Sequence, residues 1–300
     1  MVRWIGDWEE EPLTNPHQGY DITNGHHAYQ PNASGELFQQ PQYTAKLLDT
    51  IVKANEAALS KMQISMKHDL PMPVQSNISL ARFAELGARD PEVAPQIYAA
   101  LMKELSAPSK PDAGAGQHRV PLFLSFDSID HAMKLSEYLN EEGALVHAHQ
   151  LELINIFVRY MTGESALPNG GMVFAATSGS NSAVTGTLKY LLHSKHSAQT
   201  GHTERRFDTA TQTWVTGSPV PEWSPYAPFD ENVRKALESV DVQKVEGLSK
   251  AEAKGLMEYY AMSGILRNTV TERLVSEKWT LSGGGIIGDL ERATVRMRTV

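Results

Sequence analysis

The chain has 300 residues, of which 41% are apolar, and a formal charge of −8 at pH 7, which predicts a globular protein with one large core or two modest ones. No apolar run approaches the roughly 20 residues of a membrane span, and the acidic segment 1–11 resembles neither a secretory signal nor an import presequence. The lack of cysteine excludes disulfides and thiolate chemistry and suits a reducing compartment, and the negative charge argues against a surface uniformly adapted to phosphate backbones.

The first third of the chain predicts an extended arm followed by helices. Residues 1–42 are rich in Pro, Gly, Asn and Gln and lack periodicity, so we expect them to be extended. Apolar spacing and capping residues, among them Asp90 before Pro91, predict helices. Their ranges are 43–62, 79–87 and 91–105.

The middle of the chain predicts a parallel strand–helix–strand unit. Two apolar strands, 120–127 and 172–177, are separated by residues of helical character long enough to reverse the chain direction. We expect helices over 128–139 and 149–162 between them, and a sheet that is buried on both faces.

The last third predicts a surface excursion and a small helical part. Residues 194–225 are rich in Ser, Thr, His and Pro, with Arg205, Arg206 and Trp214 in a hairpin, and they follow a helix over 182–192. A capping box of Ser249 and Glu252 marks one later helix. The elements expected after the excursion are a helix over 231–237, a strand over 241–245, helices over 251–263 and 271–279, a glycine-rich turn over 281–288 and a terminal segment over 289–297.

Polar residues end both predicted strands. Asp127 ends the first, and the cluster that includes Thr177, Ser180 and Asn181 ends the second. At such an edge a carboxylate can orient a magnesium-bound water and a hydroxyl or amide can reach a terminal phosphate. Asp127 could equally cap the next helix, and the cluster is more typical of a helix N-cap. No Gly-Lys pair of a phosphate-binding loop occurs in the sequence.

Three further groups have alternative interpretations. His147, His149 and Glu152 imitate a metal triad, but their spacing favours packing or a hydrogen-bonded turn, and we assign no metal. The hypothesis for the arginines is local contact with RNA, because guanidinium groups suit phosphate, and a solvated surface is the alternative. The arginines concerned are Arg205, Arg206, Arg292, Arg296 and Arg298.

Several unusual strings occur in the same order as in a known family. They are His147-Ala-His-Gln-Leu-Glu-Leu153, Leu167-Pro-Asn-Gly-Gly171, Ala176-Thr-Ser-Gly-Ser-Asn181 and Glu277-Lys-Trp-Thr-Leu-Ser-Gly-Gly-Gly285, with further matches at 43–48, 73–77, 80–82 and 247–252. From about Asp21 to Arg298 the chain resembles the fungal branch of the death-associated protein family, GTP-binding proteins of the mitochondrial small ribosomal subunit.

The resemblance implies an α/β fold with an AAA-like P-loop NTPase core and a C-terminal helical lid. The expected domains are an arm over 1–42, a partial core over 43–228 with the insertion 194–225, and the lid over 229–300. The resemblance also implies GTP, GDP or ATP with Mg²⁺ as ligands, with Asp127, Thr177, Ser180 and Asn181 as vestigial nucleotide contacts. Gly284, within the glycine run of the lid, would match a sensor position, although such a run usually marks a helix end that requires positive φ.

The chain departs from the family pattern in two places. The family's presequence, first strand and P-loop would precede the matched region, where this chain has about twenty unmatched residues, so the resemblance implies a shortened or mis-started gene product. Ser128 stands where hydrolysing proteins of this architecture place a glutamate, and removing a water-orienting group typically costs orders of magnitude in rate. We therefore expect no enzymatic activity.

The predicted function is a structural component of the mitochondrial small ribosomal subunit, with ribosomal proteins and rRNA as partners and no membrane. Mitochondrial location is implied by the resemblance alone. The alternative is a free-standing AAA-like nucleotide-dependent switch, ATPase or GTPase, which Walker-type residues would identify. A serine hydrolase is disfavoured because no G-x-S-x-G elbow occurs.

Overall fold

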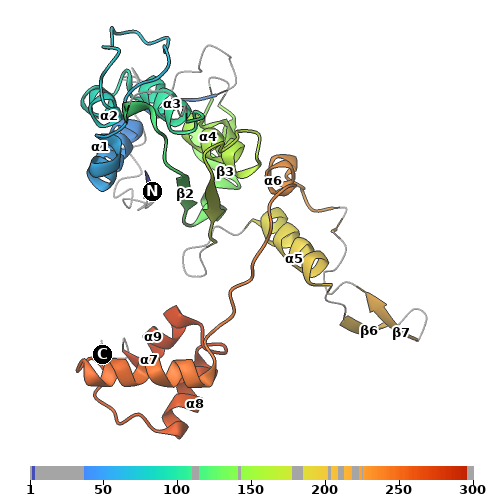
Figure 1. Ribbon diagram of the computed structural model, residues 1–300. Helices are drawn as coiled ribbons and strands as arrows, with labels where there is room; N and C mark the ends of the chain where they lie inside the picture. The colour runs from blue at the N-terminus through green and yellow to red at the C-terminus, as the bar shows by residue number, and fades with distance from the viewer. Residues whose placement is uncertain are drawn as a thin grey trace. The chain divides into compact units, whose positions relative to one another are not determined.

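A computed structural model describes two units of the chain, residues 1–241 and residues 242–300. The residues described are 2–3, 37–109, 115–140, 143–177, 185–201, 204–208, 213–217, 223–224 and 226–295, with 2–3, 115, 204–208 and 213–217 described by backbone alone. Figure 1 gives the labels of the elements. No helix among the described residues is both long and apolar enough to cross a membrane.

Three helices form one part of the first unit: α1 (Pro41–Leu59), α2 (Leu80–Arg89) and α3 (Ala94–Leu105). Ser79 caps α2 by accepting a hydrogen bond from the Arg82 backbone. A Cβ at Gly87 would lie 2.6 Å from a Leu48 methyl group and 3.1 Å from Ile97, so the lack of a side chain permits close packing of α2 on its two neighbours. The predicted helices are confirmed, except that α3 begins three residues later than expected.

Asp90 is not the N-cap of α3, contrary to the prediction. It ends α2, and its carboxylate accepts a hydrogen bond from the Glu92 backbone in a turn. The helix begins after Val93, and Pro95, not Pro91, occupies its first turn. The Asp-Pro pair therefore forms the turn between two helices, a role equally open to these residue types.

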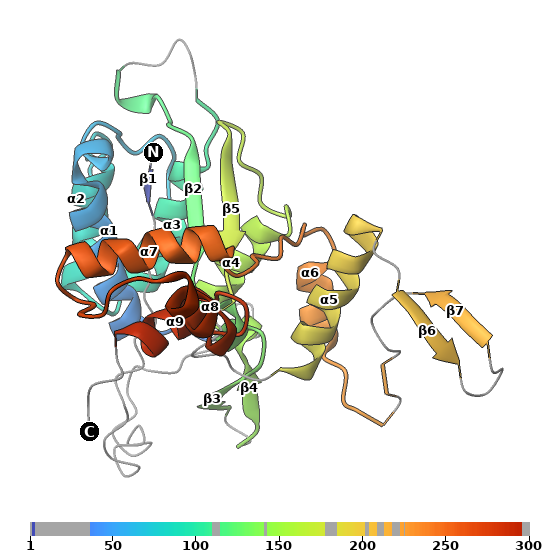
Figure 2. The same ribbon diagram turned by 90° about the horizontal axis from the view of Figure 1, so that it is seen from below.

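The parallel strand pair predicted from the sequence is confirmed. β2 (Leu122–Phe126) pairs in parallel with β5 (Gly171–Ala175), and β1 (Val2–Arg3) lies along the other side of β2. Figure 2 shows the three strands side by side in the order β1-β2-β5. The two long strands end in register, with Phe126 opposite Ala175.

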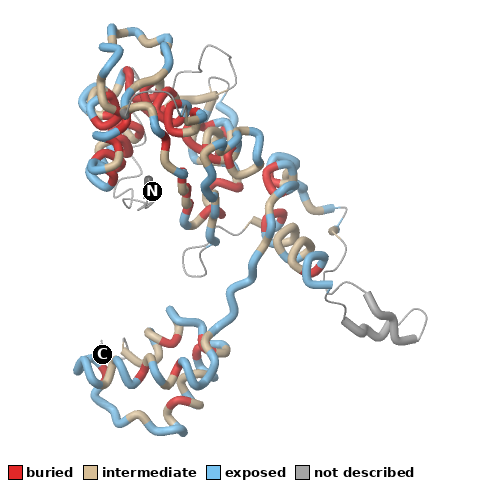
Figure 3. The backbone as a smooth tube through the Cα atoms, in the orientation of Figure 1, coloured by how far each residue is buried: buried red, intermediate tan, exposed pale blue. Residues whose placement is uncertain are grey.

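One face of this sheet is buried and the other is open in the described part of the chain. Leu122, Leu124 and Phe126 are buried, and Phe126 contacts the ring of Phe157 on α4 (Glu152–Met161) with centroids 5.1 Å apart. On the opposite face Met172 and Phe174 are exposed, at 57% and 40%. The expectation of two buried faces is wrong here, because the helices cover only one face. Figure 3 shows the buried residues concentrated in the helices and β2.

The helix predicted over 128–139 is wrong. This stretch forms the 3-10 turn η2 (Ile129–Ala132) and strand β3 (Leu135–Leu139), which pairs antiparallel with β4 (Leu145–His147). β3 alternates between half-buried and exposed residues, and Ser136 Oγ donates to the Val146 carbonyl. A second 3-10 turn, η3 (Ala148–Gln150), leads into α4, and Gly163 ends that helix with φ of 81°.

The rest of the first unit is a helix pair with a hairpin between its members. Helix α5 (Gly186–Thr200) precedes β6 (Glu204–Asp208) and β7 (Thr213–Gly217), and α6 (Glu231–Leu237) follows. The hairpin expected around Arg205 and Trp214 is confirmed. Because α6 buries Val233, Ala236 and Leu237 in the core of the first unit, the unit ends near 241, one helix beyond the boundary expected at 229.

The second unit is a small helical bundle. Its helices are α7 (Lys250–Met262), α8 (Glu272–Leu281) and α9 (Ile287–Thr294). The capping box predicted at Ser249 and Glu252 is confirmed. The predicted strand over 241–245 is wrong: this stretch forms neither helix nor strand, and Val245 is 89% exposed. Five buried residues form the core, namely Ala253, Met257, Leu266, Val275 and Leu290.

Candidate functional site

The structure brings Asp127 and Thr177 to the same edge of the sheet. The Ala176 N–H donates to the Phe126 carbonyl, and the Ile129 N–H donates to the Ala176 carbonyl, both at 2.9 Å. These two bonds continue the pairing of β2 and β5 past the ends of the strands. Both Asp127 and Thr177 are exposed there. The other two predicted members, Ser180 and Asn181, lie outside the described residues.

The Asp127 carboxylate is engaged by its own backbone turn. Its Oδ1 accepts a hydrogen bond of 2.8 Å from the Ser128 N–H. Ser128 has φ of 54°, which makes it the one described residue other than glycine in the left-handed region. This conformation turns the chain sharply from β2 into η2. The contact fits the interpretation of Asp127 as a turn-stabilising residue.

Gly284 belongs to a helix end in the second unit. Gly283, Gly284 and Gly285 all have positive φ, between 64° and 90°. A Cβ at Gly285 would lie 2.2 Å from the Leu248 carbonyl oxygen, and the Leu248 N–H donates to the Gly285 carbonyl. The glycine run is thus required by positive φ at a helix end and by the close approach of two backbone segments.

The described residues at the sheet edge do not by themselves fit a nucleoside triphosphate. Phosphates need a cradle of backbone N–H groups and a cation, whereas the described part of the edge offers one engaged carboxylate and one threonine hydroxyl. The Gly-Lys pair that supplies such a cradle in P-loop proteins is absent from the sequence. We derive no chemical step through a nucleotide.

A buried charge cluster that sequence reasoning missed lies around Glu104 of α3. Glu104 and Arg119 are 0% and 2% exposed, and Arg119 Nη2 lies 2.5 Å from Glu104 Oε2. The other donors to the Glu104 carboxylate are the backbone N–H groups of Ser65 and Met66, Ser65 Oγ, and His68 Nε2 at 2.8 Å. The cluster fixes the loop after α1 and the approach to β2 onto α3.

Hydrogen bonding determines the charge state of this cluster. Burial acts to raise the pKa of Glu104, but the hydrogen bonds from Ser65, His68 and the other donors outweigh it, so the pKa lies below its usual value. Arg119 also donates to the carbonyls of Glu104, Gly116 and Gln63. Because every oxygen of the carboxylate is already bonded within the protein, the cluster has a structural role. The only sign of this cluster in the sequence is a single Glu among the apolar residues of α3, and helical spacing does not indicate its partners.

The histidines form the hydrogen-bonded turn that the sequence favoured. His147 caps η3 by accepting from the His149 N–H, and its Nε2 lies 3.0 Å from Asp230 Oδ2. Burial, followed by the proximity of His147, lowers the pKa of His149 to about 4, against the opposing effect of Asp230. Asp230, which the sequence analysis did not single out, also caps α6. Among the described residues no group of three His, Asp or Glu side chains is placed to hold a metal ion.

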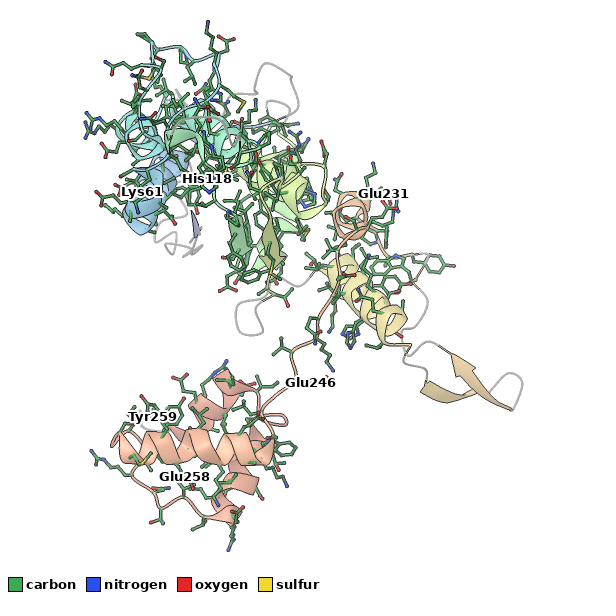
Figure 4. The ribbon with its side chains drawn as sticks, in the orientation of Figure 1. Lys61, His118, Glu231, Glu246, Glu258 and Tyr259 are labelled. Carbon is green, nitrogen blue, oxygen red and sulfur yellow. The ribbon has the colours of Figure 1, made fainter. Side chains whose placement is uncertain are left out.

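A groove lies at the other end of β2, near the C-terminal end of α1. Its volume is about 420 Å³, and Met62 and Val120 are among the residues that line it. Lys61 and His118, labelled in Figure 4, also line the groove. Because no carboxylate is among its lining residues, it offers no paired carboxylates, and we assign it no chemistry.

The arginines predicted to contact RNA belong to both units of the chain. Arg205 and Arg206 lie in β6, opposite Thr216 and Val215. Arg292 lies on α9 of the second unit, with Nη2 3.4 Å from Asp289 Oδ1. Arg296 and Arg298 lie outside the described residues.

Comparison with known proteins identifies the family of the chain. The family model for mitochondrial ribosomal death-associated protein 3 matches residues 15–293. Relatives named small ribosomal subunit protein mS29 include one from Neurospora crassa, 34% identical over 280 residues, and one from Schizosaccharomyces pombe, 22% identical over 251 residues. The alignments cover 93% and 83% of this chain but 55% and 45% of the relatives, so the chain spans about half of their length. Because the family model covers nearly the whole sequence, the chain belongs to the mitochondrial ribosomal death-associated protein 3 family.

Proposed function

We propose that this protein is a structural component of the mitochondrial small ribosomal subunit and supports translation through contacts with ribosomal proteins and, locally, with rRNA. The observation that carries the proposal is the family match over residues 15–293. The description of the family supports the mitochondrion, and the relatives named small ribosomal subunit protein mS29 support the subunit. The candidates for RNA contact from the sequence are Arg205, Arg206, Arg292, Arg296 and Arg298. Of the two in β6, which lie on opposite faces of the hairpin, we assign the contact to Arg205.

The structure agrees with a role in assembly. The open sheet face with Met172 and Phe174, and the exposed leucines of the β3–β4 hairpin, Leu135, Leu139 and Leu145, are apolar surfaces of the kind that protein partners cover. The buried Glu104 cluster, by contrast, is bonded within the chain.

We further propose that the protein does not hydrolyse nucleotides. Asp127 is held by the Ser128 N–H, and Ser128 occupies the position where hydrolysing proteins of this architecture place a water-orienting glutamate. The test measures release of phosphate from GTP and ATP by the purified chain and by Asp127→Ala. Equal background rates support the proposal, and hydrolysis that the substitution abolishes overturns it.

Assembly is tested by sedimentation. The tagged chain is produced in the mitochondrial matrix of Neurospora crassa behind a matrix-targeting sequence, and the lysate is separated on a sucrose gradient. The proposal expects the tag to peak with small-subunit rRNA and to remain there when magnesium depletion separates the subunits. A tag that stays at the top of the gradient, although the purified chain is folded by circular dichroism, overturns it.

A further inference from the structure

The acidic residues of this chain avoid one region. No Asp or Glu occurs from Ser165 to Thr203, although the chain contains 35 of them in 300 residues. The whole stretch 165–221 contains four Lys and Arg residues against two acidic ones, so the rest of the chain carries a formal charge of −10. The region is therefore the part of the protein best suited to a polyanion.

Helix α5, within this region, is firmly attached to the first unit. Lys195 Nζ donates to the carbonyls of Glu238 and Val240 just after α6, at 2.8 and 3.3 Å. On another side of α5, Tyr190 contacts the ring of Trp223 with centroids 5.1 Å apart. The helix is thus held on two sides.

The remaining side of α5 carries cationic and polar residues at helical spacing. Lys189, His193, His196 and Thr200 follow one another at intervals of four, three and four, which places them on one stripe of the helix. Lys189, His193 and Thr200 are exposed and His196 is half-buried. The stripe leads toward Gly201, which ends the helix in the left-handed conformation before the hairpin.

The β6–β7 hairpin has two chemically different faces. The strand register pairs Phe207 directly with Trp214, and Arg205 with Thr216. Because residues alternate between faces along a strand, these four share one face, which contains no acidic residue. The other face contains Arg206 together with both acidic residues of the hairpin, Glu204 and Asp208.

Among the described strands, β6 and β7 pair only with each other. Two strands alone are marginally stable in water, and β6 and β7 form a two-stranded sheet of their own. Figure 1 shows the hairpin following α5 as a separate element. An aromatic pair with a neighbouring arginine, on an acid-free face, has the composition that stacks on unpaired bases and contacts their phosphates.

We propose that the face of Arg205, Phe207, Trp214 and Thr216, together with the Lys189 stripe of α5, binds single-stranded RNA. The inference deepens the proposed function, on which it rests, by naming the RNA-binding surface and the form of RNA. Stacking requires bases that are not already paired, so a loop or an unpaired segment binds and a regular duplex does not. RNA fits this surface better than a protein partner does because cations and aromatics occur here without carboxylates.

The experiment measures binding of the full chain to a fluorescein-labelled oligouridine of about 15 nucleotides, long enough for a site of this size, by anisotropy at several salt concentrations. The key variant is Arg205→Gln, and its matched control is Arg206→Gln, which removes the same charge from the same strand but from the opposite face. Loss of one phosphate contact reduces the slope of log K against log salt by about 0.7 for single strands. The proposal expects this change for Arg205→Gln and a much smaller one for Arg206→Gln.

Stacking is tested separately with Trp214→Ala, which we expect to weaken binding about 5- to 150-fold, the range for loss of one stacked base. Val215→Ala, on the other face, is the control and should bind as the unmodified chain does. A duplex of the same sequence length should compete poorly. Circular dichroism of each variant checks that the fold is retained.

The outcomes separate this inference from the proposed function. Selective loss of binding in Arg205→Gln and Trp214→Ala supports the inference. Equal effects of Arg205→Gln and Arg206→Gln, preference for duplex, or no RNA binding at all overturns it. If the chain nevertheless sediments with the small subunit, the proposed function stands without this surface. If the chain binds RNA selectively but does not sediment with the subunit, the proposed function fails.

Discussion

Replacing Glu104 by Gln removes one charge from a buried network without a large change in shape. The carboxylate of Glu104 accepts hydrogen bonds from Ser65, Met66 and His68 and from Arg119, and it has no exposure to water. An amide can accept at its oxygen only, and its NH₂ group would face donors. Arg119 would at the same time lose its counter-charge while remaining buried.

The expected loss is large relative to the stability of an ordinary domain. Removing one partner of a buried ion pair typically costs about 3–5 kcal/mol, whereas whole domains have unfolding free energies of about 5–15 kcal/mol. We therefore expect Glu104→Gln to lower the free energy of unfolding of the first unit by about 3–5 kcal/mol. Urea unfolding followed by far-UV circular dichroism measures this change.

The matched control is Glu85→Gln. Glu85 pairs with Arg82 and Arg89 on the exposed side of α2, at 2.6 and 3.2 Å. Exposed pairs contribute about 0–1 kcal/mol, so this variant should remain close to the unmodified protein. If both variants lose less than about 1 kcal/mol, the inference that the Glu104 network stabilises the fold is refuted.

Three further predictions concern the pH dependence of Glu104, the N-cap of α6 and two glycines of the second unit. Because the pKa of Glu104 is lower in the folded than in the unfolded protein, its carboxylate contributes fully to stability above the unfolded pKa. This contribution is lost as the pH falls through the folded pKa. The free energy of unfolding should therefore fall less steeply with decreasing pH in Glu104→Gln than in the unmodified protein. Asp230→Ala should destabilise the first unit by about 1–2 kcal/mol, measured by urea unfolding, because it removes the N-cap of α6. In the second unit Gly285→Ala should destabilise the fold by at least about 1–2 kcal/mol, because Gly285 has a positive φ. Gly255→Ala should instead stabilise α7 by up to about 1 kcal/mol, because an added Cβ meets no atom within 4 Å. Thermal unfolding compares the two variants.

Each of these predictions has a contradicting result. An unchanged acid limb in Glu104→Gln would mean that other carboxylates determine the acid sensitivity. The control for Asp230→Ala is Glu231→Gln, which removes a negative charge from the first turn of α6 but keeps the cap. If both variants lose the same free energy of unfolding, the negative charge and not the cap stabilises α6. Equal effects of the two glycine substitutions would contradict the close approach to Leu248.

The local signals in the sequence predicted much of the fold. The capping box at Ser249 and Glu252 depends on residues within one turn, and α7 begins where those residues indicate. The parallel pairing of β2 and β5 followed from two apolar strands separated by a helical connection. These features depend on short-range patterns, which a single sequence contains.

The errors concern features determined by distant contacts. The sequence predicts a helix over the residues of β3, whereas the structure pairs them with β4 as a strand, a contact that local spacing does not indicate. The residues 241–245 have strand-like composition but no strand forms there. The network of Glu104 joins positions 63–68, 104 and 116–119, and no spacing within one segment indicates such a cluster. At the sheet edge the sequence predicted the meeting of Asp127 and Thr177 but not the left-handed Ser128 that engages the carboxylate.

The most direct test of the central claim is a cryo-electron microscopy map of mitochondrial small subunits purified through the tagged chain. We expect density on the subunit that fits α1–α4 together with the β2–β5 pair as one body, and we expect the β6–β7 hairpin to lie against rRNA. Tagged material without small-subunit rRNA, or subunits that lack density for this fold, would contradict it.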